Sequence, residues 1–292
     1  MEYRPEELRR LQLTLVEIVK DIDRVCRDNG ITYFLDSGSC LGAVRHAGFI
    51  PWDDDMDLGM FREDYDRFLE IAPAALGDDY VVVHPESDRR LAGMFAKVWK
   101  RGTVFATNET IEAGIPQGVF VDIFPYDAVN PDPSAASKQL RDCRFWQSVS
   151  YLYHSGSINV PHGGVIGALE RGGCKAVHGL VRAFLSPERI RASFDSAALS
   201  APVGESTGLY GVMAYADYGP FPRDVMLPVG SLPFEGVDFP VPGDYRRYLE
   251  ICYGSTWNEL PPENERRNHA PVELGFGEKA IQPPGTASCL LR

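Results

Sequence analysis

The chain has 292 residues, of which 44% are hydrophobic and 24% charged, so it can bury a sizeable core. Its formal net charge of −12 argues against nucleic-acid binding, because neutralising phosphates requires a basic face. No apolar run reaches the roughly 18 residues of a membrane span, and the charged N-terminus does not resemble a signal peptide. The six cysteines are scattered without a CxxC pair, which favours reduced thiols. We therefore expect a cytoplasmic protein without an integral membrane segment, at most peripheral at the inner membrane face.

The first predicted element is an amphipathic helix over 5–29, where apolar residues recur at helical spacing between Pro5 and Gly30. A strand over 31–35, a turn at 37–39 and a short helix over 40–46 follow. A second long helix is expected over 62–75. Branched and aromatic residues predict further strands at 55–60, 80–83, 93–99, 104–107 and 119–124. This order predicts an α+β core over 1–130, with a mixed sheet flanked by helices.

Pro131-Asp132-Pro133 marks a change in the pattern. Residues 135–200 predict helices interrupted near 159–164, which we interpret as a helical insertion (131–205) packed on the sheet. Short strands at 209–214 and 237–241, a helix over 243–253 and a tail rich in Pro and Gly make up 206–292. We expect one domain over 1–292 with these three parts.

The acidic run Asp53-Asp54-Asp55-Met56-Asp57 is the most informative stretch. An acidic run is usually a solvated loop, but here apolar residues flank it and alternate with the last two acids. In a strand, Asp55 and Asp57 would face the same side, roughly 6.5–7 Å apart. Two carboxylates facing one point repel each other unless a cation lies between them, which predicts an Mg²⁺ site, with Mn²⁺ as the alternative. A calcium loop is excluded because Leu58 stands where that loop requires Gly.

A further acid, Asp122, lies inside the apolar strand Val119–Phe124. A buried carboxylate needs a cation, a hydrogen-bonding partner or a raised pKa. Asp122 is therefore a candidate third metal ligand or general base, and the alternative is a turn cap or a partner for a structural Arg. Asp127 follows Pro125-Tyr126 and reads as a turn residue that also reaches the acceptor.

The segment Asp36-Ser37-Gly38-Ser39 closes a predicted strand and opens a helix. Small residues at such a turn let a phosphate approach the backbone N–H groups of a helix N-terminus. Gly38 and Ser39 are therefore candidate phosphate-binding residues, although ordinary turns have the same composition.

These residues carry a resemblance. Gly-Ser, a helix, Asp-x-Asp on a strand and one Asp on a later strand are similar to the nucleotidyltransferase superfamily. The run Leu35–His46 followed by Gly48–Asp57 is more specific and resembles the LicD family of phosphocholine transferases, which is related to fukutin and fukutin-related protein. Val121–Pro125, Tyr253-Gly254 and Leu260–Pro262 also match, so the resemblance covers about 30–270. Two positions depart from the family pattern: Ser39 stands where Thr is common, and Ser255 where Asp is common.

The resemblance implies a nucleotidyltransferase-type fold, a divalent metal and a CDP-alcohol donor such as CDP-choline. It places metal binding on Asp55 and Asp57, with Asp122 as the third acid. The implied reaction moves a phosphocholine-like group onto a cell-surface glycan or its precursor, including lipid-linked forms. The acceptor hydroxyl would attack the phosphorus in line and release a nucleoside monophosphate.

Several further side chains are candidates for binding the substrates. The cations Arg45 and Lys97 would neutralise phosphate, and each has a surface charge or a salt bridge as its alternative. The remaining candidates are Asp53, Trp52 and His269. Trp52, Trp99 and Tyr126 would form an aromatic wall for a quaternary ammonium group if they were not core residues.

Three alternative functions remain open at this stage. The same fold could transfer a nucleoside monophosphate and release pyrophosphate. A protein that only binds metal or carbohydrate would show no turnover. A metal-dependent phosphohydrolase usually has more His ligands than this chain offers.

Overall fold

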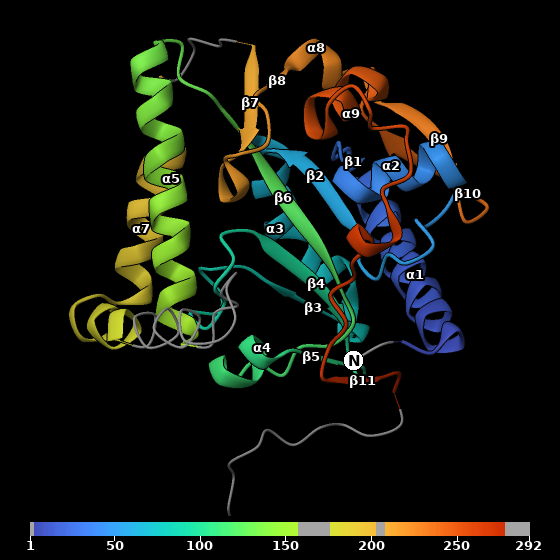
Figure 1. Ribbon diagram of the computed structural model, residues 1–292, viewed down its shortest axis with the longest axis horizontal. Coiled ribbons are helices and arrows are strands. Elements are labelled where there is room, and N and C mark those ends of the chain that lie inside the picture. The colour runs from blue at the N-terminus through green and yellow to red at the C-terminus, as the bar shows by residue number, and fades with distance from the viewer. Residues whose placement is uncertain (1–2, 157–175, 203–207, 278–292) are drawn as a thin grey trace, which may run out of the picture.

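The computed structural model describes residues 3–156, 176–202 and 208–277. Its centre is a mixed sheet with strand order β1-β2-β6-β4-β3, in which β7 also pairs with β6 and β8 pairs with β7 (Figure 1). Only the β2–β6 pairing is parallel, and the other pairings in this sheet are antiparallel. The strands of the sheet are β1 (Phe34–Leu35), β2 (Asp57–Phe61), β3 (Tyr80–Val83), β4 (Ala96–Lys100), β6 (Phe120–Ala128), β7 (Leu209–Val212) and β8 (Phe221–Pro222).

Two antiparallel strand pairs lie outside this sheet. Strand β9 (Gly230–Phe234) pairs with β10 (Val237–Val241), and β5 (Val104–Ala106) pairs with β11 (Glu273–Gly275). The β5–β11 pair ties the last described part of the chain to the core. Short 3₁₀ helices occur at η1 (Gly77–Asp79), η2 (Met213–Tyr215) and η3 (Glu263–Glu265).

Helix α1 supplies much of the core. It begins at Pro5, whose missing N–H is tolerated in the first turn, and it ends at Gly30, which has a left-handed φ of 60°. Its apolar stripe, including Leu11, Ile18 and Ile22, is fully buried. The other helices are α2 (Ser37–His46), α3 (Arg62–Ala75), α4 (Asn108–Ala113), α5 (Pro133–His154), α7 (Pro187–Ala198), α8 (Arg223–Met226) and α9 (Tyr245–Tyr253).

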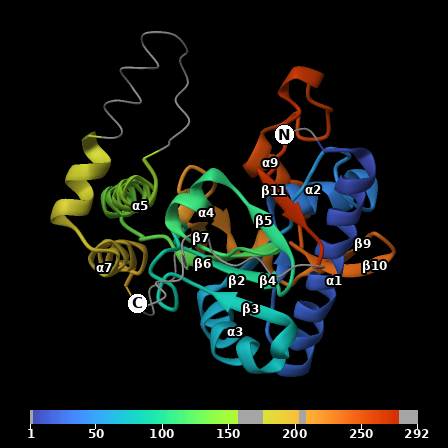
Figure 2. The same ribbon diagram turned by 90° about the horizontal axis from the view of Figure 1, so that it is seen from below.

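The sheet has one face covered by α1 and α3 and a second face that carries polar side chains. Figure 2 shows α3 on one side of the sheet and α4 with β11 on the other. On the covered face, Lys100 Nζ donates to Glu17 and Tyr80 OH donates to Asp21, both on α1, at 2.6 and 2.5 Å. Because side chains alternate along a strand, Lys97 and Asp122 project from the opposite face. We call this opposite side the open face.

The helices α5 and α7 stand beside the sheet (Figure 1). Helix α5 is attached to the segment before β4, where Gln147 accepts from Met94 N at 3.2 Å and Ser150 donates to Ala92 O at 2.8 Å. These contacts place the helical segment next to the open face. The interruption predicted near 159–164 lies outside the described residues, and the three-part division of the domain stays a prediction.

The structure confirms the α+β class, the mixed sheet and most predicted elements, among them the helix bounds at 5–29 and 62–75. Several bounds were wrong. The helix predicted from residue 40 begins at Ser37, because its first turn includes the predicted turn 37–39. Strand β2 begins at Asp57, so Asp55 precedes it. Asp127 lies within strand β6, where it pairs with Gly211 of β7, and is not a turn residue.

Two further observations concern the thiols and the membrane. The described cysteines Cys26, Cys40, Cys143 and Cys252 are free, as predicted, whereas Cys174 and Cys289 lie outside the described residues. None of the helices in the described ranges is both long and apolar enough to cross a membrane.

Candidate active site

Three charged side chains form a row across the open face. Asp57 of β2 is the register partner of Asp122 in β6, and Lys97 of β4 is the partner of Asp122 on its other side. Lys97 Nζ donates to Asp122 Oδ1 at 2.6 Å, and the ammonium lies 3.8 Å from the centroid of the Phe120 ring. The Lys97 and Asp122 side chains are 12% and 14% exposed, so this pair is largely withdrawn from water. Register alone therefore brings together three residues that are far apart in sequence.

The acids before β2 continue this row. Met56 and Leu58 are buried, whereas Asp53, Asp55 and Asp57 are half-buried, so the alternation of a strand extends back through the acidic run. The backbone supports this extension, because Asp122 N donates to Met56 O at 3.1 Å. The structure thus places Asp55 and Asp57 on one side, as the sequence predicted, and adds Asp53 to them.

The carboxylates of this cluster repel one another, which disfavours the ionised form of each. Burial and the charges of Asp55 and Asp54 raise the pKa of Asp53 to about 8. Burial, followed by the charges of Asp55 and Asp122, raises the pKa of Asp57. Burial also raises the pKa of Asp122, and the Lys97 ammonium opposes that shift. A set of crowded carboxylate oxygens is the donor set that Mg²⁺ and Mn²⁺ prefer, so these residues fit a divalent cation.

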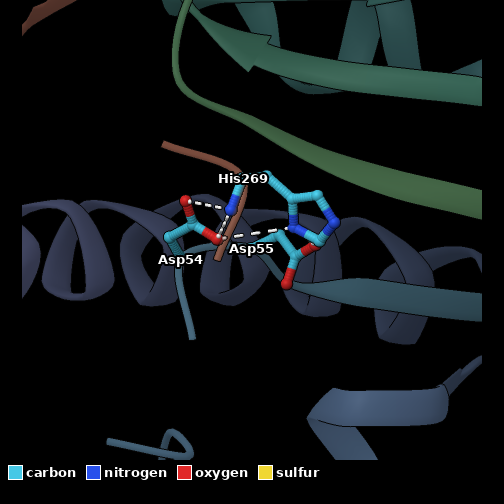
Figure 3. Close-up of side chains that lie close together, drawn as sticks. All are labelled: Asp54, Asp55 and His269. Atoms are coloured by element: carbon cyan, nitrogen blue, oxygen red, sulfur yellow. Dashed lines mark hydrogen bonds and ion pairs between the residues drawn. The ribbon is translucent and has the colours of Figure 1, made fainter. Parts of the chain in front are cut away.

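A second arrangement joins the acidic run to the C-terminal segment. The ligand atoms of Asp54, Asp55 and His269 come within 4.8 Å of one another, and the imidazole lies over Asp55 (Figure 3). Asp54 is not a free ligand, however, because both its oxygens accept from His269 N at 2.9 and 3.0 Å and Oδ2 also accepts from Tyr3 OH at 2.7 Å. We interpret Asp54 as an anchor for both ends of the described chain.

His269 is held directly beside the cluster. Its Nδ1 lies 3.4 Å from Asp55 Oδ2 and 3.5 Å from Asp54 Oδ1. The hydrogen bond with Asp54 raises the pKa of His269 to about 9, against an opposing effect of burial and with the help of the Asp55 charge. An imidazolium that is 76% exposed at the edge of an acidic cluster is available to an anionic ligand.

The start of α2 is braced against β2. Ser39 is buried, and its hydroxyl oxygen accepts from Asp57 N at 2.9 Å. Gly38 leaves room for the Asp53 carboxyl, because a Cβ at this position would lie 3.3 Å from Asp53 Oδ2. Asp36 N donates to Asp57 O at 2.9 Å and so completes the connection between the helix start and the strand.

A buried network that the sequence did not reveal supports this brace. The carboxylate of Asp36 accepts from Tyr126 OH at 2.9 Å and from Tyr248 OH of α9. Tyr248 OH in turn accepts from Ser37 N at 3.0 Å. Asp36 is 1% exposed, and burial raises its pKa while these hydrogen bonds oppose the shift. The separation of 212 residues between Asp36 and Tyr248 left no local signal in the sequence.

The remaining predicted residues have structural partners. Asp127 lies on the covered face, where Arg62 Nε and Nη2 donate to its two oxygens at 2.7 and 2.8 Å, so it does not point toward the row. Arg45 Nη1 donates to Glu259 O at 3.0 Å. The guanidinium of Arg266 lies 4.8 Å from the centroid of the Trp52 ring. The open face therefore gathers Asp53, Asp55, Asp57, Asp122, Lys97 and His269 from the predicted set.

The predicted aromatic wall is not formed. Tyr126 is 1% exposed and bonded to Asp36, and Trp99 is 6% exposed within a small apolar cluster. Both are core residues, which was the alternative interpretation of an aromatic residue in a strand. Tyrosines from other elements stand near the row instead.

Comparison with known proteins agrees with this site. The family model described as "LicD/FKTN/FKRP, nucleotidyltransferase domain" matches residues 30–145, which include β1, α2, β2, β4 and β6 and thus the whole row. The chain therefore carries a LicD-family domain over residues 30–145. The match spans both the helix that begins at Ser37 and the acidic run, so the LicD resemblance of these motifs is confirmed.

Several relatives of this chain are named as phosphotransferases. The lipopolysaccharide cholinephosphotransferase LicD of Haemophilus influenzae is 27% identical over 268 residues, which are 90% of this chain and 95% of that protein. The human ribitol 5-phosphate transferase FKRP is 40% identical over 63 residues, 22% of this chain and 13% of FKRP. The mouse ribitol-5-phosphate transferase FKTN is 41% identical over 49 residues, 17% of this chain and 11% of FKTN. The chain is thus a homologue of phosphotransferases.

Proposed function

We propose that this protein transfers a phospho-alcohol, phosphocholine or a close analogue, from a CDP-alcohol to a hydroxyl of a glycan acceptor or its lipid-linked precursor. The observation that carries the proposal is the row of Asp57, Asp122 and Lys97 in register across three strands, with Asp53 and Asp55 continuing it. Similarity over 90% of the chain to a lipopolysaccharide cholinephosphotransferase supports the choice of phosphocholine. The braced helix start before an acidic strand supports a nucleotidyltransferase-type core.

Asp55 and Asp57 would hold the divalent cation, with Asp53 as the adjacent oxygen donor. The bound Mg²⁺ or Mn²⁺ supplies charge neutralisation for a diphosphate. Asp122 is less suited to this task than the sequence suggested, because Lys97 already occupies its Oδ1 atom at 2.6 Å. We assign His269, at the edge of the acids, to an anionic oxygen of the donor, since its side chain is exposed and its pKa is raised to about 9.

Asp122 is the general base in this proposal. Among the described residues no group donates to its Oδ2 atom, so that oxygen is free to accept a proton. The acceptor oxygen forms a bond to the phosphorus that carries the alcohol, and the bond from this phosphorus to the bridging oxygen breaks. CMP leaves with the bridging oxygen, and the hydroxyl proton goes to Asp122. A carboxylate whose pKa is raised by burial is a stronger base than one in water, and such help is typically worth about 10²–10⁴-fold.

The proposal is tested by incubating the protein with CDP-choline, CDP-ribitol or CDP-glycerol and Mg²⁺, with and without sugar acceptors, while CMP release is followed. Asp55→Asn and Asp122→Asn are compared with Asp78→Asn, an exposed acid in η1 that serves as a matched control. We expect metal-dependent CMP formation in the wild type and the control, and a loss of at least about 10²-fold in the site variants.

Other outcomes would contradict the proposal. Release of pyrophosphate from CTP, with no CMP from any CDP-alcohol, would indicate nucleotidyl transfer. Tight binding of Mg²⁺ without turnover of any donor would indicate a binding protein. Equal CMP release by the wild type and both site variants would remove the acidic row from the mechanism.

A further inference from the structure

Three partly exposed tyrosines lie on α5 and on the turn that follows β7, and two of them, Tyr151 and Tyr215, meet beside the row. Tyr151 belongs to α5, and Tyr215 and Tyr218 belong to the turn that follows β7; they are 37%, 41% and 46% exposed. Large aromatic side chains usually bury more of their surface than this, and a cluster of exposed rings next to an active site favours ligand contact over core packing. We call Tyr151, Tyr215 and Tyr218 the tyrosine wall.

The wall is a built feature of the fold. Tyr151 OH and Tyr215 OH lie 3.4 Å apart, and Tyr218 N donates to Tyr215 O at 3.0 Å. The same turn is tied to α5 a second time by the ion pair between Arg144 and Asp217. The helical segment after residue 131 thus holds the turn in place, which gives α5 a part in shaping the site.

Ring contacts fix Tyr215, the central residue of the wall, next to the row. The Tyr215 ring centroid lies 5.9 Å from that of Phe95 and 5.6 Å from that of Phe124. Phe95 is two residues from Lys97, and Phe124 is two residues from Asp122, so both project from the open face. The pKa of Tyr215 is raised by burial, by the Tyr151 hydroxyl and by the charges of Asp122 and Asp57. This agrees with a position of Tyr215 beside the row.

Through its contact with Phe95, Tyr215 lies on the side of Asp122 that is away from the metal-binding acids. Strand β6 stands between β2, which carries Asp57, and β4, which Phe95 precedes. In an in-line displacement the attacking and leaving oxygens lie on opposite sides of the phosphorus. If the donor diphosphate is bound at Asp55 and Asp57, the acceptor hydroxyl approaches from the opposite side. There it lies beside the general base Asp122 and faces the wall.

The chemistry of the wall fits a neutral, hydroxyl-bearing ring. The turn carries one charged side chain between Tyr215 and Tyr218, that of Asp217, and it forms an ion pair with Arg144. The groups that the wall offers to a ligand are therefore aromatic ring faces and hydroxyl groups. A tyrosine offers an apolar body and a polar tip, which match the C–H face and the hydroxyl rim of a sugar. A phosphate group would instead be repelled by the neighbouring carboxylates.

We propose that the tyrosine wall binds the sugar of the acceptor and directs its hydroxyl toward Asp122. This inference rests on the proposed function for the direction of attack, and it adds the acceptor site that the acidic row does not supply. Tyr151 and Tyr218 are the specificity-determining contacts, whereas Tyr215 also packs on Phe95 and Phe124 and supports the turn.

The wall is tested by direct binding, independently of turnover. Saturation-transfer NMR with methyl glycosides of glucose, galactose and N-acetylglucosamine is recorded on the wild type, Tyr151→Ala, Tyr218→Ala and the double variant. Phe145→Ala is the matched control, because Phe145 is a 58% exposed aromatic residue on another side of α5. We expect at least one glycoside to bind the wild type and the control, and its dissociation constant to rise about tenfold on loss of each ring.

The outcomes separate the wall from the transfer reaction. Sugar binding that is absent in the wild type or unchanged in the double variant overturns the inference. A choline titration in the same variants provides a second arm: weakened choline binding with unchanged sugar binding would assign the wall to the transferred alcohol and also overturn it. Loss of sugar binding in the variants of a protein that releases no CMP from any CDP-alcohol would leave the wall in place and remove the proposed function alone.

Discussion

Asp57 and Asp122 are direct register partners across the parallel pair β2–β6, so two carboxyl groups share one face of the sheet, with the ammonium of Lys97 beside them. A parallel pairing of this kind fixes their spacing through the backbone, independently of side-chain packing. The arrangement is electrostatically unfavourable without a further cation, and burial increases its cost. The fold maintains it through contacts that lie outside the acidic run.

Those contacts come from both ends of the described chain, from strand β6 and from helix α9. Asp54 receives hydrogen bonds from Tyr3 OH and His269 N, and Asp36 receives them from Tyr126 and Tyr248. Each buried carboxylate thus has hydrogen-bond donors, whereas Asp53, Asp55 and Asp57 face one another. The hydrogen bonds to Asp36 and Asp54 hold the backbone around the acidic run in place, so that Asp53, Asp55 and Asp57 remain close together. A fold preorganises a charged site in this way.

Asp57→Asn is expected to stabilise the metal-free protein and to abolish transfer. The folded state raises the pKa of Asp57, so the stability associated with its protonated form is present at low pH and is lost as pH rises through that pKa. An amide cannot ionise, so the melting temperature should rise on the order of 2 °C at neutral pH, equivalent to ~1 kcal/mol in a large domain. Calorimetry of wild type and variant in EDTA checks this.

The pH dependence provides the control for Asp57→Asn. The difference in melting temperature should shrink as the pH is lowered, because the wild-type carboxyl then becomes protonated and resembles the amide. A variant that is less stable than the wild type at every pH would show that Asp57 is not electrostatically strained.

Lys97 and Asp122 are expected to be strongly coupled. Lys97→Met leaves the acids without their ammonium and should cost about 2 kcal/mol, whereas Asp122→Asn also relieves repulsion within the cluster and should cost about half as much. The double variant should be more stable than the sum of the two changes predicts, by about 1 kcal/mol. Urea unfolding of the four proteins measures this coupling, and additive changes would show that the 2.6 Å contact contributes little.

The elements that the sequence predicts well are those with a local cause. The helix over 5–29 follows from its apolar stripe and from Gly30 at its end, and the shared side of Asp55 and Asp57 follows from strand alternation. The contacts that the sequence misses are long-range. No pattern identifies Tyr248 as the partner of Asp36, or Arg62 as the residue that holds Asp127 on the covered face.

The same distinction applies to individual strands and rings. Strand β9 was not predicted because its sequence contains Gly230 and Pro233, and β11 was not predicted because its three residues form a strand only by pairing with β5. Trp99 and Tyr126 are residue types that often line ligand-binding sites, but here both are buried in the core. Their burial depends on which elements cover the sheet, and the sequence does not show this. The tyrosine wall is visible only after α5 and the 215–218 turn are placed together.

Ser39→Ala is expected to loosen the connection between α2 and β2. The buried Asp57 N–H would lose its acceptor, which costs about 1–2 kcal/mol. Ser39→Thr retains a hydroxyl at the same place and should remain closer to the wild type. Thermal unfolding and Mg²⁺ titration of the three proteins compare them, and an alanine variant with unchanged stability and unchanged metal affinity would contradict the brace.

His269 is expected to titrate far above the usual range of histidine in the metal-free protein. Its pKa of about 9 arises first from the hydrogen bond with Asp54 and then from the Asp55, Asp54 and Asp53 charges, against burial. Because this folded-state pKa lies above the ordinary value of 6.5, the stability that the imidazolium contributes is fully present below pH 6.5 and is lost as pH rises through about 9. Imidazole NMR signals followed over this range give the pKa directly, with His269→Gln identifying the resonance.

Two changes, a substitution at Asp54 and the addition of Mg²⁺, identify which groups raise the pKa of His269. Asp54→Asn should lower the pKa of His269, because it removes one negative charge and weakens the principal hydrogen bond. Saturating Mg²⁺ should lower it as well if the cation binds at Asp55, whose Oδ2 lies 3.4 Å from the imidazole Nδ1. A pKa that falls in Asp54→Asn but does not respond to Mg²⁺ would place the metal away from Asp55. A pKa near 6.5 in the untreated wild type would mean that the C-terminal segment does not hold His269 against the acids in solution.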